Sequence, residues 1–198
     1  MTSVVKPSER FKKNMIILLD IISEMFEEGK ENNVVDSDTK LITLFKVIIS
    51  STNGEYMIKN FIRKTNPYWE RIREKDIEYF KNFGLQLFMS TKEGGLEKMK
   101  EETSSENNNF IKNLSEKHIE NFKILLEGSY VSDGDSVDIF DEERKEDIWK
   151  ILSSFVRISI SHIHEERKYA DGKYTQEYFP EIKIKENCQK WDIRSIKF

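Results

Sequence analysis

The sequence predicts an all-α protein: a single-domain irregular bundle of about six helices over residues 1–172, followed by an extended C-terminal tail, residues 173–198, that can add one short strand. Three observations predict this class. Apolar residues recur at intervals of three and four through most of the chain. Capping residues and glycines divide these stretches into separate helices. The 198 residues are 37% hydrophobic and 12% aromatic, which is enough apolar material for one sizeable core.

The first helix is expected to begin after Ser8, a good N-cap, and to end near Glu28. Gly29 is expected to supply the left-handed position that terminates it. Its apolar residues follow the helical period: Phe11, Met15, Leu18, Leu19, Ile22, Met25 and Phe26.

Two further helices are expected before residue 66. Asp36 or Ser37 can cap the first of them, whose apolar face starts at Leu41. The turn-forming residues 51–54 end it, and residues 56–63 have the apolar spacing of the next helix.

A fourth helix is expected to begin at Asn66-Pro67, because proline is favoured at the first helical position. It should continue through Phe80 and stop near Gly84. Residues 91–109 are rich in Lys, Glu, Ser and Asn, which predicts a mobile loop.

The second half of the bundle should contain a fifth helix from Ser115 to Gly128 and a long helix that begins after Asp141 and ends at Asp171-Gly172. The long helix is apolar over most of its circumference, which is typical of a central helix. An alternative stays open, since residues 156–162 alternate with period two and are rich in β-branched side chains, as in a strand. We favour the helix.

The tail differs from the bundle because Pro180 breaks any helix and Ile182 and Ile184 alternate with lysines. Its large apolar residues are expected to pack on the body or to bind a partner: Trp191, Ile193, Ile196 and Phe198.

Composition excludes several classes of protein. The formal net charge of -4 gives no global attraction to nucleic acid or anionic lipid. The single cysteine, Cys188, cannot form an intramolecular disulfide. The apolar run after the basic N-terminal residues stops at Asp20, too early for a signal peptide. We therefore expect a protein of a reducing intracellular compartment.

The histidines are the first candidates for a metal site. On a helix, His162 and His164 lie about 200° apart and cannot share an ion. His162 and Glu166 have the four-residue spacing of a helical metal pair, but their order is not that of a zinc protease and no third ligand is evident. We expect His162 to be a hydrogen-bonded residue of the core or its boundary and His164 to be solvated.

The acidic segment 133–138 invites comparison with a calcium loop, with Asp133 and Asp135 as ligands. In that register Asp138 stands where the loop needs glycine, and Arg144 stands where it needs a bidentate glutamate. The segment is therefore expected to be an acidic connecting loop. The glycine-rich phosphate motifs and the serine-hydrolase motif are also absent from the sequence, so no cofactor is expected.

Three stretches carry a resemblance to a known group: residues 66–80, 118–126 and 147–163. The first contains Trp69 in a helix and the last is a late hydrophobic helix. In this order around an acidic loop, they resemble uncharacterised helical proteins encoded by nucleocytoplasmic large DNA viruses. The resemblance covers roughly residues 36–168 and lies in the overall sequence character and the order of the elements. It implies a viral origin and no catalytic residue.

The leading functional hypothesis is a non-enzymatic helical protein that binds other proteins or itself, as a virion component or an infection-stage accessory factor. The alternative is a metal-dependent enzyme or regulator that uses His162, Glu166 and the segment 133–138. A nucleic-acid accessory protein with a local basic face is a third hypothesis.

Overall fold

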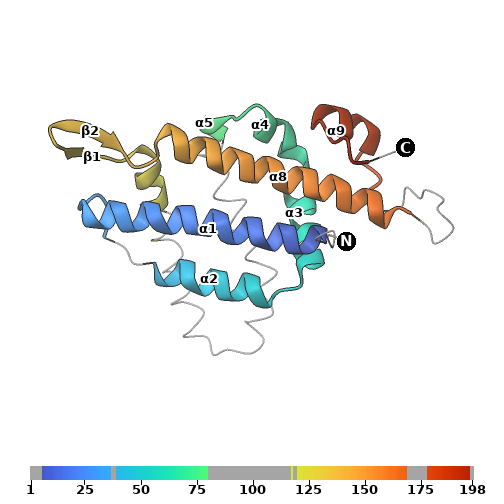
Figure 1. Ribbon diagram of the computed structural model, residues 1–198, viewed down its shortest axis with the longest axis horizontal. Helices are drawn as coiled ribbons and strands as arrows, with labels where there is room; N and C mark the ends of the chain where they lie inside the picture. The colour runs from blue at the N-terminus through green and yellow to red at the C-terminus, as the bar shows by residue number, and fades with distance from the viewer. Residues whose placement is uncertain (1–5, 37–38, 80–116, 118–119, 169–177, 197–198) are drawn as a thin grey trace, which may run out of the picture.

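The computed structural model describes residues 6–36, 39–79, 117, 120–168 and 178–196. Over these residues the chain is mostly helical, with one small two-stranded antiparallel sheet (Figure 1). The all-α prediction is confirmed.

Two long antiparallel helices form the centre of the molecule (Figure 1). They are α1, Pro7–Glu31, and α8, Glu142–Glu166, each of 25 residues. Helix α2, Lys40–Ser51, packs on α1, while α3, Gly54–Thr65, contacts both α1 and α8. The least exposed large side chains come from α1, α3, α8 and the chain around residues 125 and 139: Phe11, Leu19, Met25, Ile58, Ile62, Leu125, Ile139, Ile148, Phe155, Val156, Ile160 and Ile163.

Helix α8 is continuous through residues 156–162, so the strand alternative is wrong. The Asp141 side chain caps the helix by accepting a hydrogen bond of 2.8 Å from the backbone N–H of Arg144. The helix ends at Glu166, earlier than expected, and Asp171 and Gly172 lie outside the described residues. Its buried faces meet α1, α3 and α4, which confirms that it is a central helix.

The predicted boundaries of α1 are wrong at both ends. The helix starts at Pro7, where the missing N–H has no intrahelical partner to lose, and Lys6 occupies the cap position. Gly29 lies inside the helix and is buried. The left-handed conformation falls instead on Asn33, whose φ is 58°. Gly29 is therefore a packing residue and does not terminate the helix.

The predicted break between α2 and α3 is confirmed. The side chain of Asn53 caps α3 by accepting hydrogen bonds from the backbone N–H groups of Glu55 and Tyr56 at 2.9 and 3.1 Å. Helix α2 begins after Thr39, so Asp36 is not its cap, and Ser37 lies outside the described residues.

The expected fourth helix begins at Asn66 but is broken into three short pieces. They are the 3-10 turn η1, Asn66–Tyr68, then α4, Trp69–Arg73, and α5, Ile77–Tyr79. Lys75 has a φ of 53°, and the Asp76 carboxylate accepts a hydrogen bond of 2.9 Å from the Tyr79 N–H. This local cap competes with continuation of the helix. The expected stop at Gly84, the loop at 91–109 and the cap at Ser115 lie outside the described residues.

Residues 120–127 are helical, and the chain leaves the helix at Gly128 as expected. The next segment is a β-hairpin, so the prediction of a connecting loop is wrong. Strand β1, Ser129–Ser132, pairs with β2, Asp135–Asp138. The two turn residues, Asp133 and Gly134, have φ values of 52° and 91°. Positive φ at both central residues is typical of a type I′ turn, whose twist matches that of the two flanking strands.

Glu28 links the base of this hairpin region to α1. Its carboxylate lies 2.5 Å from the guanidinium of Arg144, and both side chains are mostly buried. Arg144 also donates a hydrogen bond of 2.5 Å to the carbonyl of Ile139, the residue after β2. Figure 1 shows the hairpin projecting from this end of the bundle.

The tail packs on the body and forms a helix, α9, Ile184–Lys190, so the described part of it adds no strand. Ile182 and Ile184 are both buried, as their alternation suggested, but residues 178–182 form bends and a turn, and Lys183 is the N-cap of α9. The buried Arg167, just after α8, donates hydrogen bonds to the carbonyls of Tyr178 and Phe179. The tail thus shares the hydrophobic core of the bundle.

Candidate functional site

Two regions at opposite ends of α8 have features beyond core packing. One is an arginine-lined pocket beside the C-terminal half of α8, and the other is the projecting β-hairpin. The residues proposed from the sequence as metal ligands are divided between these two ends.

His162 lies at the C-terminal end of α8 and is almost fully buried. Its Nε2 atom is hydrogen-bonded to the hydroxyl of Tyr178 at 3.2 Å, and the two rings meet edge to face. Burial lowers the pKa of His162 below 6.5, against the opposing effect of Glu166 and other nearby glutamates. Burial also raises the pKa of Tyr178 to about 12, so its hydroxyl keeps its proton at neutral pH. His162 is therefore a satisfied core residue, as expected from the sequence.

The alternative metal site does not assemble. Glu166 is exposed, and Asp133 and Asp135 lie on the hairpin at the other end of α8. A helix of 25 residues is about 36 Å long, so these carboxylates cannot share an ion with His162. Within the described parts of the chain, no three His, Cys, Asp or Glu side chains group closely enough to hold a metal.

His164 was expected to be solvated, and this expectation is wrong. Only 6% of it is exposed, because it lies on the same buried side of α8 as Ile160. Burial, followed by the charge of Lys168, lowers its pKa below 6.5.

The apolar residues proposed as partner contacts belong mainly to the protein's own core. Trp191 is 4% exposed, and Ile193 and Ile196 are partly buried against the same cluster. Phe198 lies outside the described residues. The tail was expected either to pack on the body or to bind a partner, and in the structure its described part packs on the body.

Cys188 is likewise a core residue of α9. Burial raises the pKa of its thiol, which disfavours the thiolate that nucleophilic chemistry requires.

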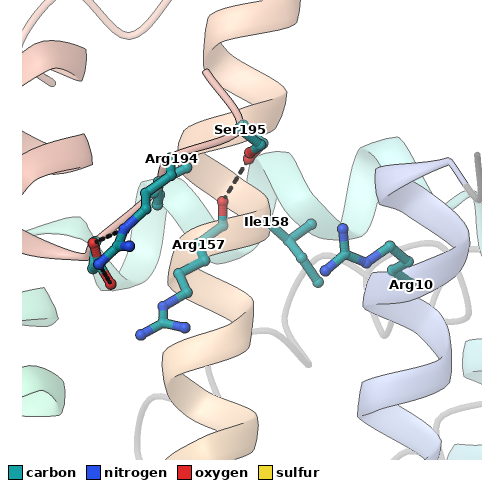
Figure 2. A pocket seen from close by; sticks show the side chains of 8 residues that line it. Arg10, Arg157, Ile158, Arg194 and Ser195 are labelled. Carbon is teal, nitrogen blue, oxygen red and sulfur yellow. Dashed lines mark hydrogen bonds and ion pairs between the residues drawn. The ribbon is translucent and has the colours of Figure 1, made fainter. Parts of the chain in front are cut away.

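The pocket has a volume of about 270 Å³ and is lined by residues of α1, α8 and the segment after α9. Figure 2 shows Arg10 and Arg157 on either side of Ile158, with Arg194 and Ser195 contributed by the last segment. Arg194 forms an ion pair with Asp192, with Nε and Oδ1 2.8 Å apart. These arginines were not singled out in the sequence because they lie far apart along the chain and none belongs to a motif.

The hairpin has two distinct faces. Tyr130 and Val137 stand directly opposite each other and are half-buried, whereas Val131 on the other face is 75% exposed. Within the described residues the sheet has only these two strands, so the outer edge of each strand is unpaired. The sequence signal for this element was the Asp133-Gly134 pair, which is the preferred dipeptide of a two-residue hairpin.

No protein-family model, curated protein or solved structure matches this chain. Among the helices of the described ranges, none has both the length and the apolar character needed to cross a bilayer.

Proposed function

We propose that the chain is a non-enzymatic protein that binds other proteins, and that the β-hairpin is its docking element. The observation that carries the proposal is the unpaired edge of β1 next to the exposed side chain of Val131. An exposed strand edge offers a row of backbone donors and acceptors to an incoming extended segment.

Strand register decides which backbone groups are available. The two-residue turn is closed by the pair Ser132 and Asp135, and hydrogen-bonded pairs alternate with non-bonded pairs along an antiparallel ladder. The hydrogen bond of 3.0 Å from the Ile139 N–H to the Gly128 carbonyl agrees with this alternation. The N–H and C=O of Val131 therefore point away from β2, and among the described residues no strand pairs with them, which leaves them for a partner strand.

Charge indicates what kind of segment would bind. Residues 129–138 contain three aspartates and no lysine or arginine. Asp141, Glu142 and Glu143 add further negative charge directly after the hairpin. A partner segment with Lys or Arg near its ends and β-branched residues between them matches both this charge and the exposed Val131.

The resemblance to proteins of large DNA viruses supports a viral setting for this activity, as a virion component or an infection-stage accessory factor, in the host cytoplasm or the virion.

Selection from a library of random peptides tests the proposal without a known partner. We expect the wild-type protein to enrich extended, basic, β-branched peptides. The variant Val131→Pro should not bind them, because proline removes the outward N–H without removing a ladder hydrogen bond. Val131→Thr, which keeps that N–H and the β-branched shape, is the matched control. Failure to enrich any such peptide, or equal binding by Val131→Pro, would contradict the proposal.

A further inference from the structure

Ser132 is the last residue of β1 and directly precedes the turn of the projecting hairpin (Figure 1). Ser132, Asp133 and Asp135 are all exposed. A Cβ atom built at Gly134, in the turn itself, would meet no atom beyond its chain neighbours within 4 Å. The space around the turn is therefore open, and the hydroxyl of Ser132 is accessible to the active site of another protein.

The charges that flank this hydroxyl are all negative. Asp133 and Asp135 stand at the first and third positions after Ser132, and residues 124–131 before it contain no lysine or arginine. Protein kinases distinguish substrates partly by such charge patterns, and acidophilic kinases select carboxylates at these two positions. Ser129 and Ser136 are exposed serines of the same hairpin, but neither has a carboxylate at its first or third following position.

We propose that Ser132 is a phosphorylation site for an acidophilic serine/threonine kinase. The kinase transfers the γ-phosphoryl group of ATP to the Oγ atom of Ser132. A bond forms between Oγ and the γ-phosphorus, and the bond from that phosphorus to the β–γ bridging oxygen breaks. ADP leaves, and the hydroxyl proton passes to a base of the kinase.

A kinase binds the acceptor segment in an extended conformation, which requires the turn to open. Strand β1 is already extended up to Ser132, whereas Asp133 and Gly134 have positive φ. Extending the turn breaks the pair between Ser132 and Asp135, at the open end of the ladder. Because a two-stranded sheet is only marginally stable, this opening is local and leaves the helical bundle intact.

Phosphorylation would act on the docking edge of β1, and this consequence rests on the proposed function of the hairpin. A phosphate adds about −1.5 to −2 charge at neutral pH, and residues 129–138 contain no lysine or arginine to neutralise it. Its repulsion of Asp135, directly opposite, falls on the pair next to the turn, beyond the outward backbone groups of Val131. Binding of a basic segment to that edge should therefore become tighter.

Incubation of the full chain with a purified acidophilic kinase, Mg²⁺ and ATP tests the site. Mass spectrometry of the tryptic peptide 124–144 should find one phosphate, on Ser132. The variant Asp133→Asn/Asp135→Asn should be phosphorylated at least about tenfold more slowly. Asparagine is as suitable as aspartate before the turn glycine, so this variant keeps the hairpin. Asp138→Asn, which removes a carboxylate outside the two positions, is the matched control and should react at the wild-type rate.

Three results would overturn the assignment: no phosphate in this peptide of the wild type, a phosphate on Ser129 or Ser136 instead, or an unchanged rate in the double variant. Peptide binding is measured separately, with the phosphorylated and the unmodified protein at low ionic strength. The phosphorylated form should bind a selected basic peptide about threefold or more tightly, and equal affinity would overturn the regulatory role. If neither form binds any such peptide, the proposed function and the regulatory role both fail, while mass spectrometry still decides the phosphorylation site.

Discussion

Gly29 of α1 lies directly against Leu125 of the helix formed by residues 120–127. A Cβ atom at position 29 would fall well inside van der Waals contact with Cδ2 of Leu125 and 3.1 Å from Cγ2 of Val35. Leu125 is fully buried and cannot easily move aside. The absence of a side chain at Gly29 therefore sets how closely these two helices approach.

Gly29→Ala should consequently destabilise the protein. Alanine would stabilise an exposed helix by about 1 kcal/mol relative to glycine, but overpacking a tight core costs about 1–3 kcal/mol. Urea unfolding should show a net loss. In the Leu125→Ala background the same substitution should cost less, because the space is already vacated. A stabilising effect of Gly29→Ala alone would mean that the two helices are less tightly packed.

Asn53→Ala should lower the free energy of unfolding by about 1 kcal/mol, because two backbone N–H groups at the start of α3 lose their acceptor. Thr39→Ala is the matched control, since Thr39 occupies the cap position of α2 without a side-chain capping bond. Chemical denaturation of both variants gives the comparison. Equal losses would show that the Asn53 cap is not formed.

His162 should make stability depend on pH in a defined direction. Burial lowers its pKa in the folded protein, so the unfolded chain binds more protons near pH 6. The stabilising contribution of the neutral His162 side chain is fully present above its pKa in the unfolded chain, about 6.5. It is lost as the pH falls through the lower pKa that His162 has in the folded protein.

The measurement is urea unfolding at about pH 7.5 and about pH 5.5. Wild type should lose more stability between these two values than His162→Gln, and an NMR titration of the His162 ring should give a pKa below 6.5. A ring that titrates at or above that value would reverse the expected sign.

Trp191→Ala should destabilise the protein by about 3–5 kcal/mol, since its side chain is buried in the shared core. Val131→Ala, at an exposed site, should change stability by less than about 0.5 kcal/mol. Thermal unfolding of the two variants separates a core role for Trp191 from a role in partner binding. Unchanged stability in Trp191→Ala would indicate that the tail does not pack as described.

Local signals in the sequence were sufficient to predict the long helices but not the tertiary contacts between them. Helix α8 was predictable because the acidic cap at Asp141 and the apolar pattern after it are both local. The packing role of Gly29 was not predictable from the sequence. A glycine near the end of a helix is typical of a C-terminal cap, and only the contact with Leu125 of a second helix shows the other role. The break at Asp76 depended on a side-chain cap that competes with a helix of otherwise good periodicity.

The candidate sites show the same division. The segment with Asp133 and Asp135 was interpreted as an acidic connecting loop, and its hairpin signal, the Asp133-Gly134 pair, was overlooked. Arg10, Arg157 and Arg194 line one pocket only because of tertiary packing, so no spacing along the chain could have grouped them. The large apolar residues of the tail were predicted to be covered by the body or by a partner, and Trp191, Ile193 and Ile196 pack against the hydrophobic core of the bundle itself.

Backbone amide hydrogen exchange at Val131 tests the central functional claim most directly. In the free protein this N–H should exchange rapidly, because it points away from β2 and has no partner strand within the described residues. On addition of a basic extended peptide obtained by selection, it should become protected, while the amides of α2, a remote helix, remain unchanged. Rapid exchange at Val131 in the presence of saturating peptide, or protection confined to a helix, would contradict docking at the hairpin edge.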